Sequence, residues 1–169
     1  RAVEIGKENV YDFSLGNPSV PAPEKVNETI RNLTLEMEPC ALHGYTSAVG
    51  DNETRQAIAD DLNRRFGTSF SMNNFYMTAG AAASLCITFR ALAEKDDEII
   101  IFAPYFPEYQ VFISASGAKP VEVKCKEDDL QIDLEAFKNA INEHTKAVVL
   151  NSPNNPSGVV TSEETVKAM

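Results

Sequence analysis

The sequence has few of the side chains that build disulfide frameworks and most metal sites. Its three cysteines, Cys40, Cys86 and Cys125, are odd in number, far apart and without a Cys-x-x-Cys pair. This pattern argues against a disulfide framework and a thiolate metal site and is typical of a reducing compartment, so we predict a cytoplasmic protein. His43 and His144 have no neighbours at metal-ligand spacing, and we therefore predict no metal site.

Long apolar runs and an excess of basic charge are also missing. The longest strongly apolar run, residues 99–103, ends at Pro104 and is far shorter than the roughly 18 residues that a membrane span requires. The sequence has 15 Lys and Arg against 25 Asp and Glu, a formal net charge of -10. Such a charge repels phosphodiester backbones and anionic lipid, so neither a nucleic acid nor a membrane is expected as a partner.

What the sequence does contain is enough apolar material for an ordinary core. Hydrophobic residues make up 43% of the 169 residues and charged residues 24%. A chain of this length buries roughly 70% of the surface that its unfolded form exposes. The composition therefore excludes a disordered chain and fits one domain, or one lobe of a larger protein.

Two amphipathic helices are expected in the first half of the chain. Proline and glycine interrupt residues 11–23, which predicts an extended arm. From Glu24 onward, apolar residues recur four, three and four positions apart, as on one face of a helix. A loop over residues 43–50 follows, and Asp51 then caps a second helix that Gly67 ends.

The second half of the sequence alternates short strands with helices. A strand over residues 98–103 is apolar throughout, which is typical of a parallel strand buried on both faces, and 120–124 is more polar and is expected nearer an edge. The alternation predicts an α/β fold, a mostly parallel sheet with helices on both faces. Two more strands are expected at residues 75–78 and 147–150, and the second of these is also expected to be buried. Helices are expected at residues 81–93 and 107–116, and a third helix is expected to begin at residue 134, with Asp133 as its N-cap.

The end of the sequence suggests an incomplete fold. Residues 161–164 have the Thr-x-x-Glu form of a capping box and should open a helix, yet the sequence stops at Met169 after about two turns. We therefore expect a truncated fold, the remainder of which is not in this chain.

Ligands on parallel sheets bind at the carboxyl ends of the strands, where this sequence places several unusual loops. The first loop, residues 78–83, joins a strand to a helix through Gly80. Its small residues let a ligand approach the backbone, and the free N–H groups at a helix start suit a phosphate. The alternative is a tight strand-to-helix connection that serves packing alone.

The other loops combine rigidity with amide or aromatic side chains. Residues 151–158 contain two prolines, three asparagines and a glycine, so that side-chain amides can point into a site; a solvent-facing turn is the alternative. Phe106 follows another strand end and is able to stack on a planar ring, although such an aromatic more often belongs to the core. Tyr45 offers a phenol on an earlier loop and is weak evidence alone.

Taken together, these segments resemble the class I/II aminotransferases, the fold-type I enzymes that use pyridoxal 5'-phosphate (PLP). FSLGNPSVPAP is similar to the family's N-terminal substrate arm, HGYTSAVGDNETRQAIA to its Tyr-x-x-x-x-Gly segment with the following helix, and NSPNNPSG to its most recognisable sequence. These matches occur in family order from Asp12 to Gly158.

The resemblance implies a domain organisation. Residues 1–45 would be the N-terminal arm, first helix and loop, and residues 46–169 an incomplete PLP-binding large domain of the fold-type I class. The family's Schiff-base lysine and the aspartate that pairs with the pyridine nitrogen are expected beyond Met169. No catalytic residue is therefore named in this chain.

The resemblance also implies roles for individual residues. Backbone amides at Gly80, Ala81 and Ala82 would hold the PLP phosphate, although several relatives have a serine or threonine hydroxyl in this turn. Phe106 would stack on the pyridine ring, where relatives often have tryptophan. Asn155 would hydrogen-bond the ring's phenolic oxygen and help to hold the substrate carboxylate.

The resemblance implies roles for two further residues, Gly16 and Tyr45. Gly16 would bring the backbone of the arm beside the substrate carboxylate. Tyr45 would reach the phosphate bound in the neighbouring subunit, so a homodimer is expected.

The activity implied for the complete protein is transamination, in which an amino group moves from an amino acid to a 2-oxo acid through PLP. Residues 1–169 alone are expected to be inactive. The alternatives are another fold-type I PLP enzyme, such as a carbon-sulfur β-lyase, and a non-catalytic aminotransferase-like domain that senses a ligand. The segment NSPNNPSG favours transamination among the PLP reactions.

Overall fold

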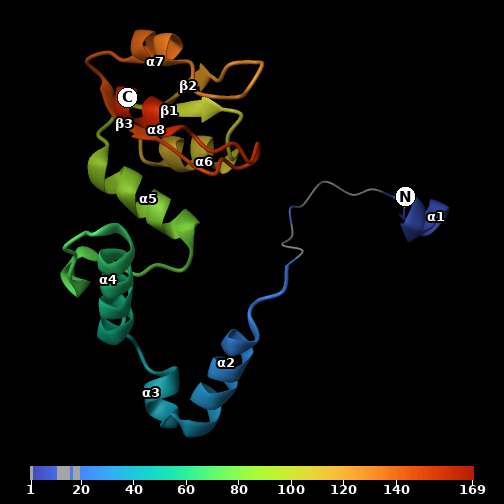
Figure 1. Cartoon of the computed structure of the whole chain (residues 1–169), viewed down its shortest axis with the longest axis vertical. Helices are drawn as coiled ribbons and strands as arrows, with labels where there is room; N and C mark the ends of the chain where they lie inside the picture. The colour runs from blue at the N-terminus through green and yellow to red at the C-terminus, as the bar shows by residue number, and fades with distance from the viewer. Residues whose placement is uncertain (1, 11–15, 17–19) are drawn as a thin grey trace. The chain divides into compact units, whose positions relative to one another are not determined.

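The computed structural model describes residues 2–10, 16 and 20–169 and divides the chain into two compact units, Arg1–Ala48 and Val49–Met169 (Figure 1). The predicted extended arm falls mainly on residues 11–15 and 17–19, which lie outside the described residues.

The first unit consists of short helices, α1 (Ala2–Ile5), η1 (Lys7–Asn9), α2 (Glu24–Glu36) and α3 (Pro39–His43). Helix α2 begins at Glu24, as the apolar spacing predicted. Its apolar side chains Val26, Ile30 and Leu33 are nevertheless 44–57% exposed, and α2 buries no side chain. His43 was predicted in a loop but ends α3, a helical turn that begins at Pro39 and is capped by the Glu38 side chain.

The second unit opens with α4 (Asn52–Phe66), whose two ends match the prediction. The Asp51 carboxylate accepts a hydrogen bond from the Thr54 N–H at 2.8 Å, and Gly67 ends the helix with a left-handed φ of 66°. Hydrogen bonds from Thr54, first of all from its N–H, hold the pKa of Asp51 below its usual range.

The predicted strand at residues 75–78 is wrong. The structure has a 3-10 turn, η2 (Met72–Asn74), followed by irregular chain. The Met77 N–H donates to the Val49 carbonyl, a loop residue, at 3.0 Å. Hydrogen bonding to the loop before α4, in place of a neighbouring strand, explains why an apolar, strand-like sequence does not join the sheet.

The structure describes three strands, β1 (Glu98–Ala103), β2 (Lys119–Lys124) and β3 (Thr145–Val149). They form one parallel sheet in the order β2-β1-β3, which confirms the α/β class. Strand β1 is central, and its Ile99 pairs with Pro120 on one side and with Ala147 on the other. Strand β2 lies at an edge, as expected, where a proline that cannot donate to the sheet is tolerated. The remaining elements are the helices α5 (Ala81–Leu92), α6 (Glu108–Ala115), α7 (Leu134–Ala140) and α8 (Glu163–Ala168).

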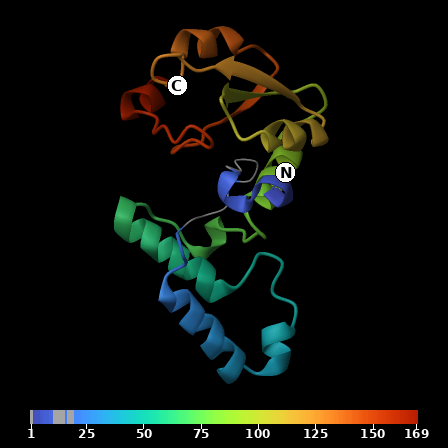
Figure 2. The same ribbon diagram turned by 90° about the vertical axis from the view of Figure 1, so that its right-hand side faces the viewer.

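The core lies on both faces of β1, whose Ile99, Ile100 and Ile101 are 0% exposed. Ile99 and Ile101 pack with residues of α5 and α6, whereas Ile100 and its neighbour Phe102 pack with Phe137 of α7. Figures 1 and 2 show α7 on one face of the sheet and α6 on the other. This arrangement confirms the prediction of a sheet covered on both faces.

Two details near the C-terminus differ from the predictions. Strand β3 is half-exposed and not buried, because it lies at the second edge of the described sheet. Helix α8 is capped by Ser162, whose hydroxyl accepts from the Thr165 N–H at 3.1 Å, and not by Thr161. The Thr161 N–H instead donates to the Ser152 hydroxyl at 2.9 Å, which keeps Thr161 in the preceding loop.

Candidate functional site

The turn before α5 has the geometry of an anion site. Gly80, the N-cap of α5, has φ 85° and ψ 166°, a conformation that is almost exclusive to glycine. A Cβ at Gly80 would meet no atom within 4 Å, so the backbone conformation, and not lack of space, requires glycine here. Ala81 and Ala82 are exposed, and N–H groups in a first helical turn have no intrahelical partner.

Hydrogen bonds within this turn decide which amides stay available. The Gly80 N–H donates to the Thr78 carbonyl at 2.9 Å, which leaves the Ala81 and Ala82 amides as the free donors among the three predicted residues. The Thr78 hydroxyl donates to the Gly80 carbonyl at 3.0 Å and lies 2.5 Å from the Ser84 hydroxyl. No role was predicted for these two hydroxyls from the sequence, although both lie within four residues of the turn glycine.

The asparagine-rich loop after β3 uses two of its three asparagines to hold its own shape. The Asn151 side chain accepts from the Asn155 N–H at 2.7 Å. The Asn154 side chain accepts from both the N–H and the hydroxyl of Ser157, at 3.1 and 2.9 Å. The Asn155 side chain is exposed and makes no hydrogen bond within the described part of the chain. The loop thus presents one free amide on a braced backbone.

Phe106 packs in the core, which is one of the two interpretations that the sequence left open, and its stacking on a planar ring stays a prediction. Its ring is half-buried and packs against the α5–α6 core cluster, edge-on to Tyr109, with centroids 5.6 Å apart. Burial also raises the pKa of the Tyr109 hydroxyl. Leu85, from the second turn of α5, packs on the same cluster. The phosphate-type turn and Phe106 therefore belong to one packed body.

The loops after β1 and β3 meet at a cavity of about 20 Å³. This volume has room for about one water molecule, so the cavity joins the loops but is too small for a cofactor. Neither Phe106 nor Asn155 lines it. Its lining includes the polar side chains of Tyr105, Tyr109, Asn151, Asn154, Ser157 and Thr161.

Tyr105 links this loop to the edge strand. Its hydroxyl donates to the Glu122 carboxylate at 2.8 Å and accepts from the Gln110 side chain. Burial, and then the Glu122 carboxylate, raise the pKa of Tyr105 above its ordinary value of 10.0.

We expect Tyr105 to lose its proton at a higher pH than an ordinary tyrosine. An ultraviolet titration of wild type and Tyr105→Phe checks this, because the phenolate signal that the substitution removes should appear at a higher pH than that of an ordinary tyrosine. Glu122→Gln should lower the pKa of Tyr105 but leave it above the ordinary value, because burial is the larger cause. Loss of a phenolate signal in the ordinary tyrosine range on Tyr105→Phe would contradict the assignment.

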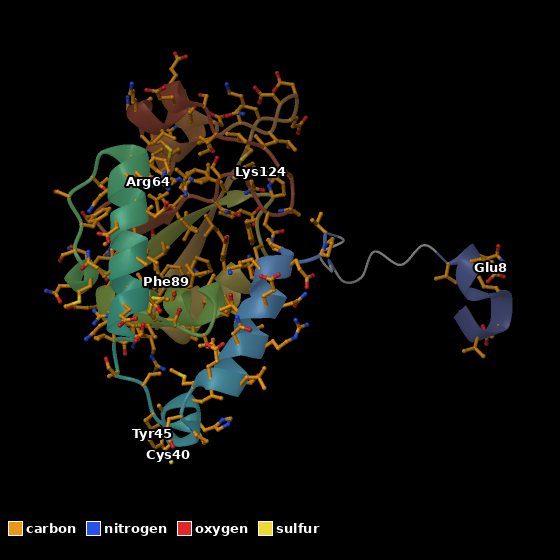
Figure 3. The ribbon with its side chains drawn as sticks, turned by 60° about the horizontal axis from the view of Figure 1, so that its bottom comes forward. Glu8, Cys40, Tyr45, Arg64, Phe89 and Lys124 are labelled. Atoms are coloured by element: carbon orange, nitrogen blue, oxygen red, sulfur yellow. The ribbon has the colours of Figure 1, made fainter. Side chains whose placement is uncertain are left out.

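Tyr45 and Gly16 belong to the first unit, and both are exposed. Tyr45 lies beside Cys40 in this unit (Figure 3). The roles implied for Tyr45 and Gly16 stay predictions. Among the described residues no group of three His, Cys, Asp or Glu side chains is placed to hold a metal ion, and no helix is long and apolar enough to cross a membrane.

The family model of the class I and II aminotransferases matches residues 8–169. The chain belongs to this family. An aminotransferase from Eubacterium rectale of known structure is 59% identical to this aminotransferase-family chain, with a TM-score of 0.95 over 98% of the chain and 42% of its own length. A Thermus thermophilus aspartate aminotransferase mutant is 31% identical, with a TM-score of 0.87 over 99% of the chain and 44% of its own length.

A curated relative agrees with these structures. A probable aspartate/prephenate aminotransferase from Thermus aquaticus is 34% identical over 172 residues, which cover 100% of this aminotransferase-family chain and 44% of the relative. The chain thus spans less than half the length of the relatives that it matches. The class I and II aminotransferases are PLP enzymes of fold-type I, and the sheet and its strand-end loops are part of that fold.

Proposed function

We propose that the complete protein is a PLP-dependent aminotransferase that moves an amino group between an amino acid and a 2-oxo acid. The observation that carries this proposal is the loop after β3, in which Asn151 and Asn154 brace the backbone and leave the Asn155 amide free. A rigid loop with one free amide at a strand end suits recognition of a ligand oxygen.

The residues around the α5 turn fit a phosphate. The Ala81 and Ala82 amides, the positive end of the α5 dipole and the open space beside Gly80 would together hold the dianionic group. The absence of a hydroxyl on these two residues removes one donor type but leaves backbone donation intact. The neighbouring Thr78 hydroxyl is already engaged with Gly80 and Ser84.

The remaining site residues would contact the ring and the substrate. Phe106 would stack on the pyridine ring, and Asn155 would donate to the ring's phenolic oxygen and help to hold the substrate carboxylate. When bound, PLP supplies an electron sink for the substrate's α-carbon. We further propose that Gly16 lies near the substrate carboxylate and that Tyr45 reaches the phosphate of a neighbouring subunit in a homodimer.

The domain organisation and location follow the same proposal. Residues 1–45 would be the N-terminal arm, first helix and loop, and residues 46–169 part of the PLP-binding large domain. The few, unpaired cysteines favour a cytoplasmic enzyme.

The test is product analysis on the full-length protein loaded with PLP. We expect a new amino acid and a new 2-oxo acid in equal amounts only when both an amino donor and a 2-oxo acceptor are present. Aspartate is the first donor to try, because two of the relatives above carry it in their names. Release of ammonia and a 2-oxo acid without an acceptor would instead indicate a lyase. Residues 1–169 alone should show no turnover.

A further inference from the structure

The chain that leads into the phosphate turn is held by α4. Arg55, in the first turn of α4, is only 5% exposed. Its Nη1 group donates to the Met72 carbonyl at 2.9 Å and lies 3.5 Å from the Phe75 carbonyl, and its Nη2 group donates to the Asn52 side chain at 2.5 Å. One guanidinium thus ties the start of α4 to the backbone of η2.

A second contact holds the same segment from the loop before α4. Gly50 has φ 98°, and a Cβ at this position would lie 2.4 Å from Cγ of Met77. The Val49 carbonyl accepts from the Met77 N–H at 3.0 Å. Gly50 is therefore required both by its backbone conformation and by the close approach of Met77.

Only Thr78 and Ala79 separate Met77 from Gly80. The three steps from Met77 to Gly80 span at most about 11 Å of extended chain, so the position of the turn depends on where residues 72–77 are held. We refer to Val49, Gly50 and Arg55 as the α4 clamp.

The choice of arginine at this position has a physical reason. A buried residue that only filled space would be better apolar, because an enclosed guanidinium is costly unless its donors are satisfied. Arg55 has no carboxylate partner within ion-pair distance among the described residues, and its Nε makes no hydrogen bond. What it offers is a planar fork that reaches two backbone carbonyls and a side-chain oxygen at once, which lysine cannot do.

We propose that Arg55 is a positioning residue for the cofactor phosphate: through the carbonyls of Met72 and Phe75 it sets the turn from which the Ala81 and Ala82 amides donate. This inference rests on the function proposed above. It assigns Arg55 no contact with the cofactor and no part in the chemistry.

The test compares PLP with pyridoxal, which has the same ring but no phosphate, by titration calorimetry on the full-length protein. We expect Arg55→Met to weaken PLP binding by at least about tenfold, because displacing a preorganised turn degrades its donors, and to leave the affinity for pyridoxal unchanged. Arg55→Lys should lie in between. Arg64→Met is the matched control, since Arg64 lies near the other end of α4 (Figure 3), is exposed and contacts Asp61.

A merely structural role would move both affinities together. Equal weakening of PLP and pyridoxal binding, or no weakening of either, would overturn the inference. If Arg55→Met does not fold, the loss of PLP affinity can be compared with the loss of pyridoxal affinity in Arg55→Lys and Gly50→Ala, because both substitutions disturb the α4 clamp. Wild-type protein that binds neither compound would refute the proposed function itself, which separates the two failures.

Discussion

We expect Asn155→Ala to lower kcat/KM of the full-length protein by about 10–100-fold and to leave its melting temperature unchanged. The Asn155 side chain makes no hydrogen bond within the described part of the chain, so its removal costs the fold little. A hydrogen bond to a charged ligand group contributes about 1.5–3 kcal/mol, which corresponds to this loss of rate. Steady-state kinetics and thermal unfolding check the two halves of the prediction.

Asn154→Ala is the matched comparison, one residue earlier in the same loop. The Asn154 side chain accepts two hydrogen bonds from Ser157, so its removal should lower both the melting temperature and the activity. If Asn155→Ala destabilised the protein as much as Asn154→Ala, or left the activity intact, Asn155 would be a structural residue and the argument from the free amide would fail.

The largest expected effect on stability belongs to Ile101→Ala. Ile101 is 0% exposed in the central strand and packs in the cluster that also carries Phe106. Loss of its side chain leaves a cavity, and we expect the free energy of unfolding to fall by about 2–5 kcal/mol. Urea unfolding of the full-length protein, followed by circular dichroism, measures the change.

Ile101→Val provides a graded control at the same site. Removing one methylene should cost about 0.5–1.5 kcal/mol, because the cavity is smaller. Equal effects of the two substitutions, or a cost of Ile101→Ala below that of Ile101→Val, would show that the site collapses and that the packing around β1 is looser than the structure indicates.

Elements with strong local signals were predictable from sequence. The ends of α4 follow from a carboxylate at Asp51 that caps the first turn and from Gly67, whose left-handed backbone ends the last. Strand β1 follows from an unbroken apolar run that stops before Pro104. In each case the residues that decide the structure lie within a few positions of one another.

The segment at residues 75–78 shows where local signals are insufficient. Its apolar sequence fits a strand, but a strand needs a neighbouring strand, and the long-range hydrogen-bond partners of this segment are Val49 and Arg55. Thr161 is a similar case, because the Ser152 hydroxyl, nine positions away, takes its N–H and moves the helix cap to Ser162. Both errors arise from competition by residues distant in sequence.

Arg55 was missed although a signal was present. It lies three positions before Ile58, where the apolar stripe of α4 would continue toward the N-terminus, and a charged residue in such a place needs buried partners. Two of those partners are backbone carbonyls, and because every residue has a carbonyl, the sequence does not indicate which ones Arg55 binds. The sequence therefore shows that Arg55 is unusual but not what it binds.

The amino-acid sequence alone determined the α/β class, most helix and strand positions, and the loops that carry the family's residues, because these depend on short-range spacing, caps and turn residues. The tertiary structure decided which asparagine side chains of the loop after β3 bond the loop itself and which one stays free. It also decided which amides of the α5 turn stay free and how α4 holds residues 72–77, which lead into that turn. These depend on hydrogen bonds whose partners are chosen by the packing of the whole unit, since a side chain binds the acceptor or donor that the fold brings within reach.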